Sequence, residues 1–223
     1  MTMKLFTGPL SMFGAKAQIA ALEKGLVFET YMVPFNADDG YEPKHPEVLR
    51  VNPKRQVPVL VDGNVELFDS TQIFEYLEDV APQPPLWPPG VAQRARARLL
   101  EHKSDEVFFP HVIRLMGLQH DMQSAAAIAA CAGCARFYDE LERTLIDREH
   151  LAGAYSFADI AFYMAHVFAH RKGAGMTSAT PRLVAWRDRV GARPAVREVV
   201  RPMMAFLASQ GRSVPAFLQS LLA

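Results

Sequence analysis

Residues 81–90 place the strongest constraint on how this chain can fold. They read APQPPLWPPG and contain five prolines. Because proline fixes φ and lacks an N–H donor, the segment predicts a stiff, extended connector rather than a helix or a strand. Strand-like patterns occur only before it, and helix-like patterns dominate after it. This change in the type of secondary structure predicts one domain at 1–81, a linker at 82–92 and a second domain at 93–223.

The part of the chain before the connector predicts the order βαβαββα, with a mixed four-stranded sheet and helices packed on it. Apolar and β-branched runs indicate the strands, and Asp62-Gly63 between the last two is typical of a hairpin turn. The expected strands are 3–7, 26–33, 57–61 and 65–68. The expected helices are 12–24, 47–51 and 69–80.

The part after the connector shows apolar residues at helical spacing and no strand signal. The expected helices are 91–119, 124–148, 157–172, 181–190 and 195–209. The fold class predicted for the chain is therefore α/β followed by all-α.

Composition argues against several classes of partner. Lys plus Arg equal Asp plus Glu at 24 each, so no global field favours nucleic acid or an anionic membrane. No apolar run approaches the ~18 residues of a membrane span, and the start MTMKLFTGPL does not resemble a secretory signal. Two cysteines are too few for a secreted disulfide framework. We expect a cytoplasmic protein with neither nucleic acid nor membrane as a partner.

Pro58 interrupts the apolar run Val57–Val61, where a central strand needs every N–H. Two arrangements are equally consistent with this segment. Pro58 can be a trans proline that begins the strand. Alternatively, a cis Val57–Pro58 bond can turn the N–H and C=O of Val57 outward, where they would pair with the backbone of an extended peptide.

Four segments together carry a family resemblance. They are NPKRQVPVLVDGNVELFDSTQIFEYLED (52–79), PLSMFGAKAQIAALEKGLVFE (9–29), LAGAYSFADIAF (151–162) and LVAWRDRVGARPAV (183–196). Together they resemble the cytosolic glutathione S-transferases, and the matches recur in the family's order along the chain from Lys4 to Val196. The chain is most similar to serine-type, bacterial-like members.

The resemblance implies a thioredoxin-like N-terminal domain that binds glutathione and a helical domain that lines the site of an electrophile. It implies a homodimeric enzyme that conjugates the glutathione thiolate to small hydrophobic electrophiles, as in detoxification, without a further cofactor. A peroxidase, isomerase or dehalogenase would need the same thiolate. A relative that binds ligands or proteins without catalysis is a separate alternative. A thiol-exchange enzyme is disfavoured, because Ser11 stands where such members place cysteine.

The resemblance also assigns glutathione-binding residues. Val57, followed by Pro58, would pair its backbone with the cysteinyl part, and Asp69 with Ser70 would hold the γ-glutamyl end. A physical reason supports this second role, because the free N–H groups of a helix start can receive a carboxylate. Two further residues, Lys44 and Gln56, would address the glycyl carboxylate and the backbone. An ordinary solvated lysine fits position 44 equally well, and His45 and Lys54 are rivals.

Ser11 is the residue that the resemblance assigns to catalysis. Its role would be hydrogen-bond donation to the glutathione sulfur, not nucleophilic attack. Capping of the following helix is an alternative reason for a serine there, and Thr7 is a competing hydroxyl. Many members carry arginine a few residues later, whereas this chain has Gly14-Ala15-Lys16-Ala17.

An electrophile pocket between the domains would be lined by aromatic, branched and methionine side chains, which suit varied apolar substrates. The candidates are Phe13, Phe109, Val112 and Met116. Ordinary helix packing explains any one of them as well.

Three further motifs bear on folding, thiol chemistry and metal binding. Ser156 and Asp159 form a Ser-x-x-Asp capping box, whose loss should cost about 0.5–2 kcal/mol of stability. Cys131 and Cys134 lie three apart in an alanine-rich helical pattern, which favours buried thiols over a redox pair. His166 and His170 share a helix face without an evident third ligand, so we expect no metal site.

Overall fold

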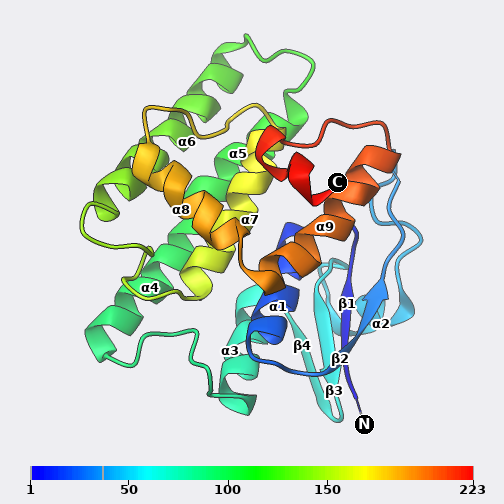
Figure 1. Cartoon of the computed structure of the whole chain (residues 1–223). Coiled ribbons are helices and arrows are strands. Elements are labelled where there is room, and N and C mark those ends of the chain that lie inside the picture. The colour runs from blue at the N-terminus through cyan, green and yellow to red at the C-terminus, as the bar shows by residue number, and fades with distance from the viewer. Residues whose placement is uncertain (1, 37, 223) are drawn as a thin grey trace. The chain divides into compact units, whose positions relative to one another are not determined.

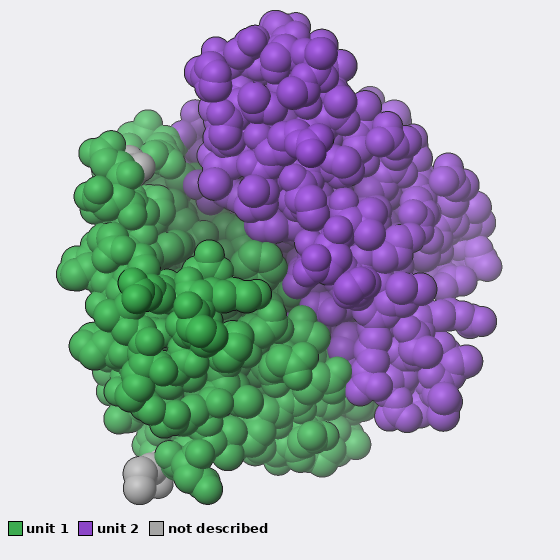
Figure 2. Space-filling view, turned by 180° about the vertical axis from the view of Figure 1, so that it is seen from behind, with its two compact units in different colours: residues 1–85, 194–212, 221–223 green, residues 86–193, 213–220 purple. Residues whose placement is uncertain are grey.

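The computed structural model describes residues 2–36 and 38–222, which divide into two compact units (Figure 2). Unit 1 contains Met1–Pro85, Pro194–Arg212 and Leu221–Ala223, and unit 2 contains Leu86–Arg193 and Ser213–Ser220. The first division falls after Pro85, inside the segment expected to be a linker. The helix at Pro194–Ser209 belongs to unit 1, whereas the sequence analysis assigned residues 195–209 to the helical domain.

Unit 1 is built on a four-stranded mixed sheet, which confirms the expected βαβαββα order. Its strands are β1 (Met3–Thr7), β2 (Phe28–Met32), β3 (Val59–Asp62) and β4 (Val65–Phe68), arranged in the order β2-β1-β3-β4. β2 runs parallel to β1, whereas β3 is antiparallel to both β1 and β4. Strand β3 begins at Val59 rather than at Val57, because Pro58 has no N–H to donate to a ladder.

Helices cover both faces of this sheet (Figure 1). The helices of unit 1 are α1 (Met12–Glu23), α2 (Pro46–Val51), α3 (Ser70–Val80) and α9 (Pro194–Ser209). Val48 of α2 packs against Phe6 and Val59 on one face of the sheet. Helices α1 and α3 pack together on the other face, and α9 lies along α1.

A buried lysine joins the end of α1 to the proline-rich connector. Lys24 Nζ donates to the carbonyls of Ala81 at 2.6 Å and Pro84 at 3.1 Å, and it pairs with Glu78 at 2.6 Å. The ammonium therefore has three oxygen partners, which offset its removal from water. This contact secures the start of the connector against the helical layer of unit 1.

Unit 2 consists of helices and loops, as expected of an all-α domain. Its helices are α4 (Val91–Lys103), a π-helical turn (Ser104–Phe108), α5 (Phe109–Gly117), α6 (Ala125–Thr144), α7 (Phe157–Arg171) and α8 (Pro181–Gly191), and a 3-10 segment (Ala216–Leu221) follows α9. The single helix expected at 91–119 was wrong: the π-helical turn interrupts it just before Pro110, which has no N–H to continue the regular pattern. Within the described residues, no helix is long and apolar enough to cross a membrane.

The capping box at the start of α7 is present, and it extends further than expected. Asp159 is wholly buried, and its Oδ2 accepts from the N–H of Ser156 at 2.9 Å and from its hydroxyl at 3.1 Å. Its Oδ1 accepts from Trp186 Nε1 at 2.7 Å and from the Leu151 N–H at 3.0 Å. One carboxylate thus satisfies donors from the N-cap residue of α7, from α8 and from the loop before α7.

We expect Asp159→Ala to lower the free energy of unfolding by about 3 kcal/mol or more, beyond the loss of a helix cap. The reason is that several buried donors would lose their acceptor, at roughly 1–3 kcal/mol each. The measurement is urea denaturation. Asp188→Ala is the control, because it removes an exposed carboxylate paired with Arg187 and should change stability by about 1 kcal/mol or less. A loss of under ~1 kcal/mol in Asp159→Ala would contradict this role.

Candidate functional site

The register of the sheet brings three separate turns to one end of unit 1. Phe6 of β1 pairs with Val59 of β3, and Val59 pairs with Phe68 of β4. The turn after β1, the segment before β3 and the start of α3 therefore all leave the sheet at the same end. Because neighbouring strands lie ~4.8 Å apart, residues of these turns form a single surface.

Ser11 lies at the first of these turns and caps α1. Its Oγ accepts from the Gly14 N–H at 3.0 Å, and its own N–H donates to the Gly8 carbonyl at 3.0 Å. The residue is buried, with 8% of its surface exposed. The expected capping role is confirmed, whereas hydrogen bonding to a sulfur stays a prediction.

Gly14 allows the first turn of α1 to rest on the end of β1. A Cβ at Gly14 would lie 1.9 Å from Thr7 Oγ1 and 3.0 Å from Ser11 Oγ. Thr7 is fully buried, and its hydroxyl has no hydrogen-bond partner in the described part of the chain. Thr7 is thus a packing neighbour of the turn rather than the accessible hydroxyl, and sequence reasoning had missed the role of Gly14.

A second glycine shapes the same turn. A Cβ at Gly8 would stand 2.0 Å from the ring of Tyr41, so the loop between β2 and α2 folds back onto the turn after β1. The aromatic ring thereby packs against the backbone of Gly8 at the start of the turn. The sequence offered no signal for this contact, because nothing local relates residues 8 and 41.

The segment before β3 presents an unpaired backbone. The Val57–Pro58 bond is cis, so the trans arrangement was wrong. In the described structure, neither the N–H nor the C=O of Val57 makes a hydrogen bond. The preceding loop is held by buried Asn52, which donates to the Gln56 carbonyl at 2.6 Å and accepts from the Lys54 N–H at 2.9 Å. The side chain of Gln56 remains exposed.

Asp69 and Ser70 form the third turn, at the start of α3. Asp69 has φ 74°, a conformation that costs residues other than glycine of the order of 1–3 kcal/mol and that clusters at ligand sites. Its Oδ1 accepts from the N–H groups of Thr71 at 3.0 Å and Gln72 at 3.3 Å. Its Oδ2 has no such bond in the described chain, and the neighbouring Ser70 is buried.

Lys44 is engaged within its own loop. Its Nζ pairs with Glu42 and donates to the Tyr41 carbonyl at 3.3 Å, and its N–H donates to Glu42 Oε2 at 3.1 Å. The hydrogen bond from the Lys44 ammonium lowers the pKa of the Glu42 carboxyl group. Contact between Lys44 and a glycyl carboxylate stays a prediction, and it would require exchange of the Glu42 partner.

The residues expected to line an electrophile pocket have different environments. Phe13 is half-buried in α1 with Lys16 Nζ 5.3 Å from its ring centroid. In α5 of unit 2, Phe109 and Val112 are buried, whereas Met116 is 49% exposed. Ordinary packing accounts for Phe109, which stacks on Phe168 at 5.8 Å between centroids. Their part in a pocket stays a prediction.

In the thiol and imidazole motifs of unit 2, Cys134 and His166 are buried, whereas Cys131 and His170 are half-buried. Burial raises the pKa of Cys134 to about 12, so the thiol stays protonated at neutral pH. His166 is completely buried, which lowers its pKa well below the usual value, and its Nδ1 lies 3.3 Å from the Tyr138 hydroxyl. Across residues 2–36 and 38–222, no group of three His, Cys, Asp or Glu side chains could hold a metal ion.

Comparison with known proteins agrees with this arrangement. Residues 5–85 match the family model of the glutathione S-transferase N-terminal domain. Glutathione S-transferase 3 of Zea mays is 30% identical over 89% of this chain and 93% of its own length. The chain belongs to the glutathione S-transferase family. This assignment confirms the expected thioredoxin-like domain followed by a helical one.

Two further similarities differ in extent. The stringent starvation protein A homolog of Coxiella burnetii is 34% identical, but the match spans only 48% of each chain. The crystal structure of the glutathione transferase URE2P8 from Phanerochaete chrysosporium with oxidized glutathione has a TM-score of 0.81. It shares 20% identity over 93% of this chain and 97% of that one, so it supports the fold alone.

We expect Gly14→Ala to lower the free energy of unfolding by about 1–3 kcal/mol, because the added methyl meets Thr7. The usual effect of this change inside a helix is a gain of about 0.5–1 kcal/mol, so the sign is diagnostic. Thr7→Ala should recover part of the loss in the double variant, measured by thermal and urea denaturation.

Gly117→Ala is the matched control, since a Cβ there meets no atom within 4 Å. It should be neutral or stabilising. If Gly14→Ala stabilised the protein as much as Gly117→Ala does, the turn would not be packed on β1 as described.

Proposed function

We propose that the protein is a serine-type glutathione transferase that conjugates the glutathione thiolate to small hydrophobic electrophiles. The observation that carries the proposal is the unpaired backbone of Val57 at the same end of the sheet as Ser11. An unpaired N–H and C=O on one residue suit an extended peptide ligand, which pairs by adding backbone hydrogen bonds. Membership of the family supports glutathione as that peptide.

The polar groups around Val57 fit the two ends of glutathione. Asp69 Oδ2 is oriented by the cap on Oδ1 and can meet the γ-glutamyl ammonium. Because Asp69 takes the N–H groups of Thr71 and Gln72, the carboxylate would be received by the N–H of Ser70 at the start of α3. Lys44 and Gln56 are proposed for the glycyl end.

Ser11 can cap α1 and bind a thiolate at the same time. The cap uses a lone pair of Oγ, because Gly14 N–H is the donor. The hydroxyl proton is therefore available to the glutathione sulfur. Sequence reasoning treated the cap and the catalytic role as competing explanations, whereas the geometry makes them compatible.

The energies suffice without a general base. A thiol of pKa ~8.5 is about 3% ionised at pH 7, and a fall of two units raises this to roughly three quarters, at ~2.7 kcal/mol. One hydrogen bond to a charged group supplies ~1.5–3 kcal/mol, and a helix N-terminus adds ~0.3–1 kcal/mol. We propose no cofactor beyond glutathione, a cytoplasmic location and a homodimer, by analogy with the family.

One observation favours a second candidate function. Ser11 is only 8% exposed, which is consistent with a residue that only caps α1. In that case the protein would bind glutathione or a glutathione-like peptide without activating its thiol. Peroxidase, isomerase and dehalogenase activities all need the thiolate, so each of them also requires that the protein lower the pKa of the glutathione thiol.

We expect the pKa of protein-bound glutathione to lie about two units below that of free glutathione, and we expect Ser11→Ala to abolish most of this shift. The measurement is the ultraviolet absorbance of the thiolate as a function of pH. The rate at which the glutathione thiolate displaces chloride from a chloronitrobenzene electrophile should fall in parallel.

Ser124→Ala is the matched control. Ser124 also caps a helix, α6, by accepting from the N–H three residues on, at 3.3 Å. Its loss should lower stability by a similar amount, about 0.5–2 kcal/mol, and leave the thiol pKa unchanged. Binding without a pKa shift would establish the non-catalytic alternative, and an absence of binding would overturn both.

A further inference from the structure

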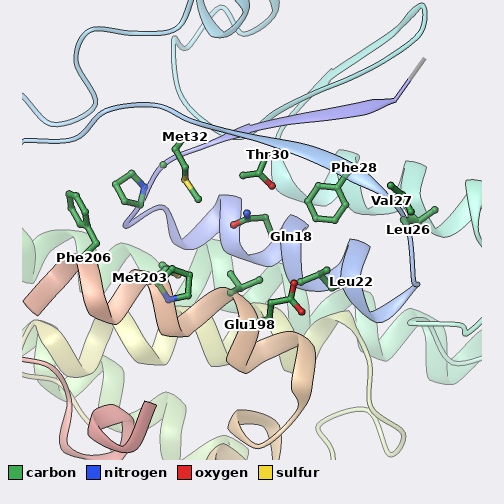
Figure 3. Close-up of a pocket in the computed structure, with 14 residues that line it drawn as sticks. Gln18, Leu22, Leu26, Val27, Phe28, Thr30, Met32, Glu198, Met203 and Phe206 are labelled. Carbon is green, nitrogen blue, oxygen red and sulfur yellow. The ribbon is translucent and has the colours of Figure 1, made fainter. Parts of the chain in front are cut away.

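A separate cavity lies within unit 1, on the face of the sheet covered by α1 (Figure 3). Its volume is about 460 Å³, within the range of small-molecule sites. The edge strand β2, helix α1 and helix α9 form most of its wall, and Gly8-Pro9 of the turn after β1 and Leu26-Val27 before β2 complete it. None of Ser11, Val57 and Asp69 lines it, so it is distinct from the proposed glutathione site.

Most of the wall is apolar. Phe28 and Met32 of β2 face Leu22 of α1 and Met203 and Phe206 of α9. Met32 is 52% exposed although it is a large hydrophobic side chain. Strand β2 has a strand neighbour only on its β1 side, and the cavity lies between this edge strand and α9, where an apolar body can enter.

Three polar side chains from three different elements surround the same space: Gln18 of α1, Thr30 of β2 and Glu198 of α9. None of them makes a hydrogen bond or ion pair with another described residue. Glu198 is the single charged residue among those that line the cavity in the described structure. An apolar wall with a few unpaired polar groups is the usual composition of a ligand site.

We propose that this cavity binds small amphipathic amines, in which an aromatic or aliphatic body carries a protonated amino group. The body would lie against Phe28, Leu22 and Met203, and the ammonium would meet the Glu198 carboxylate. The side-chain amide oxygen of Gln18 and the hydroxyl oxygen of Thr30 offer further acceptors for the remaining N–H groups of the ammonium. Glu198 disfavours an anionic ligand of the same shape, since like charges repel.

The test uses three naphthalene probes with the same aromatic body: naphthylethylamine, naphthylethanol and naphthylacetate. We expect the amine to bind most tightly to the full chain, measured by calorimetry and by chemical shifts at Thr30. Glu198→Gln should weaken the amine roughly fivefold to tenfold and leave the alcohol unchanged. Glu106→Gln, which removes the charge of an exposed glutamate outside the cavity, should change nothing.

Thr30→Trp fills the cavity from an exposed strand position and should abolish binding of the amine and the alcohol. Circular dichroism checks that this variant folds. Glutathione binding, titrated in parallel, should be unchanged in Glu198→Gln, which separates this proposal from the proposed function. Equal affinity for all three probes, insensitivity to Glu198→Gln, or displacement of the amine by glutathione would each overturn it.

Discussion

The antiparallel pairing of β3 with β1 on one side and with β4 on the other determines where the candidate site forms. The pairs Phe6–Val59 and Val59–Phe68 align the end of β1, the start of β3 and the end of β4. A slip of one residue would turn every side chain of β3 to the opposite face of the sheet. Burial of Val59 and Leu60 on the two faces leaves little freedom for such a slip.

Around that alignment, each turn supplies a different kind of group. Asn52 holds the loop that presents the unpaired backbone of Val57, and Gly14 lets the capped start of α1 approach β1. Asp69 is held at positive φ while it caps α3. The unpaired backbone before β3 and two capped helix starts thus lie at the same end of unit 1. The positions of the Ser11 and Asp69 side chains depend on how the backbone folds there.

Local patterns were enough to predict much of this architecture. Strand and helix periodicity, the Asp62-Gly63 turn and the capping residues all depend on neighbours in the sequence, and the structure bears them out. The cis Val57–Pro58 bond was one of two options, because a proline alone does not decide its own geometry. The helix expected across residues 91–119 was wrong at Ser104–Phe108, where the pattern of apolar residues continues but the backbone hydrogen bonds become π-helical.

Contacts between distant residues could not be predicted. Lys24 with Pro84, Gly8 with Tyr41 and Asp159 with Trp186 each join segments that no local rule relates. The packing of α9 on α1, and with it the cavity that contains Glu198, also emerges only when the chain is folded. Sequence reasoning therefore identified candidate side chains better than it identified what positions them.

Amide hydrogen exchange at Val57 tests the central claim most directly. We expect the Val57 N–H to exchange more slowly, and its resonance to move, when glutathione is added, because the tripeptide backbone would become its acceptor. The exposed Asn64 in the β3–β4 turn is the internal reference and should not change. Glutathione binding that leaves the exchange of Val57 unaltered would contradict the account.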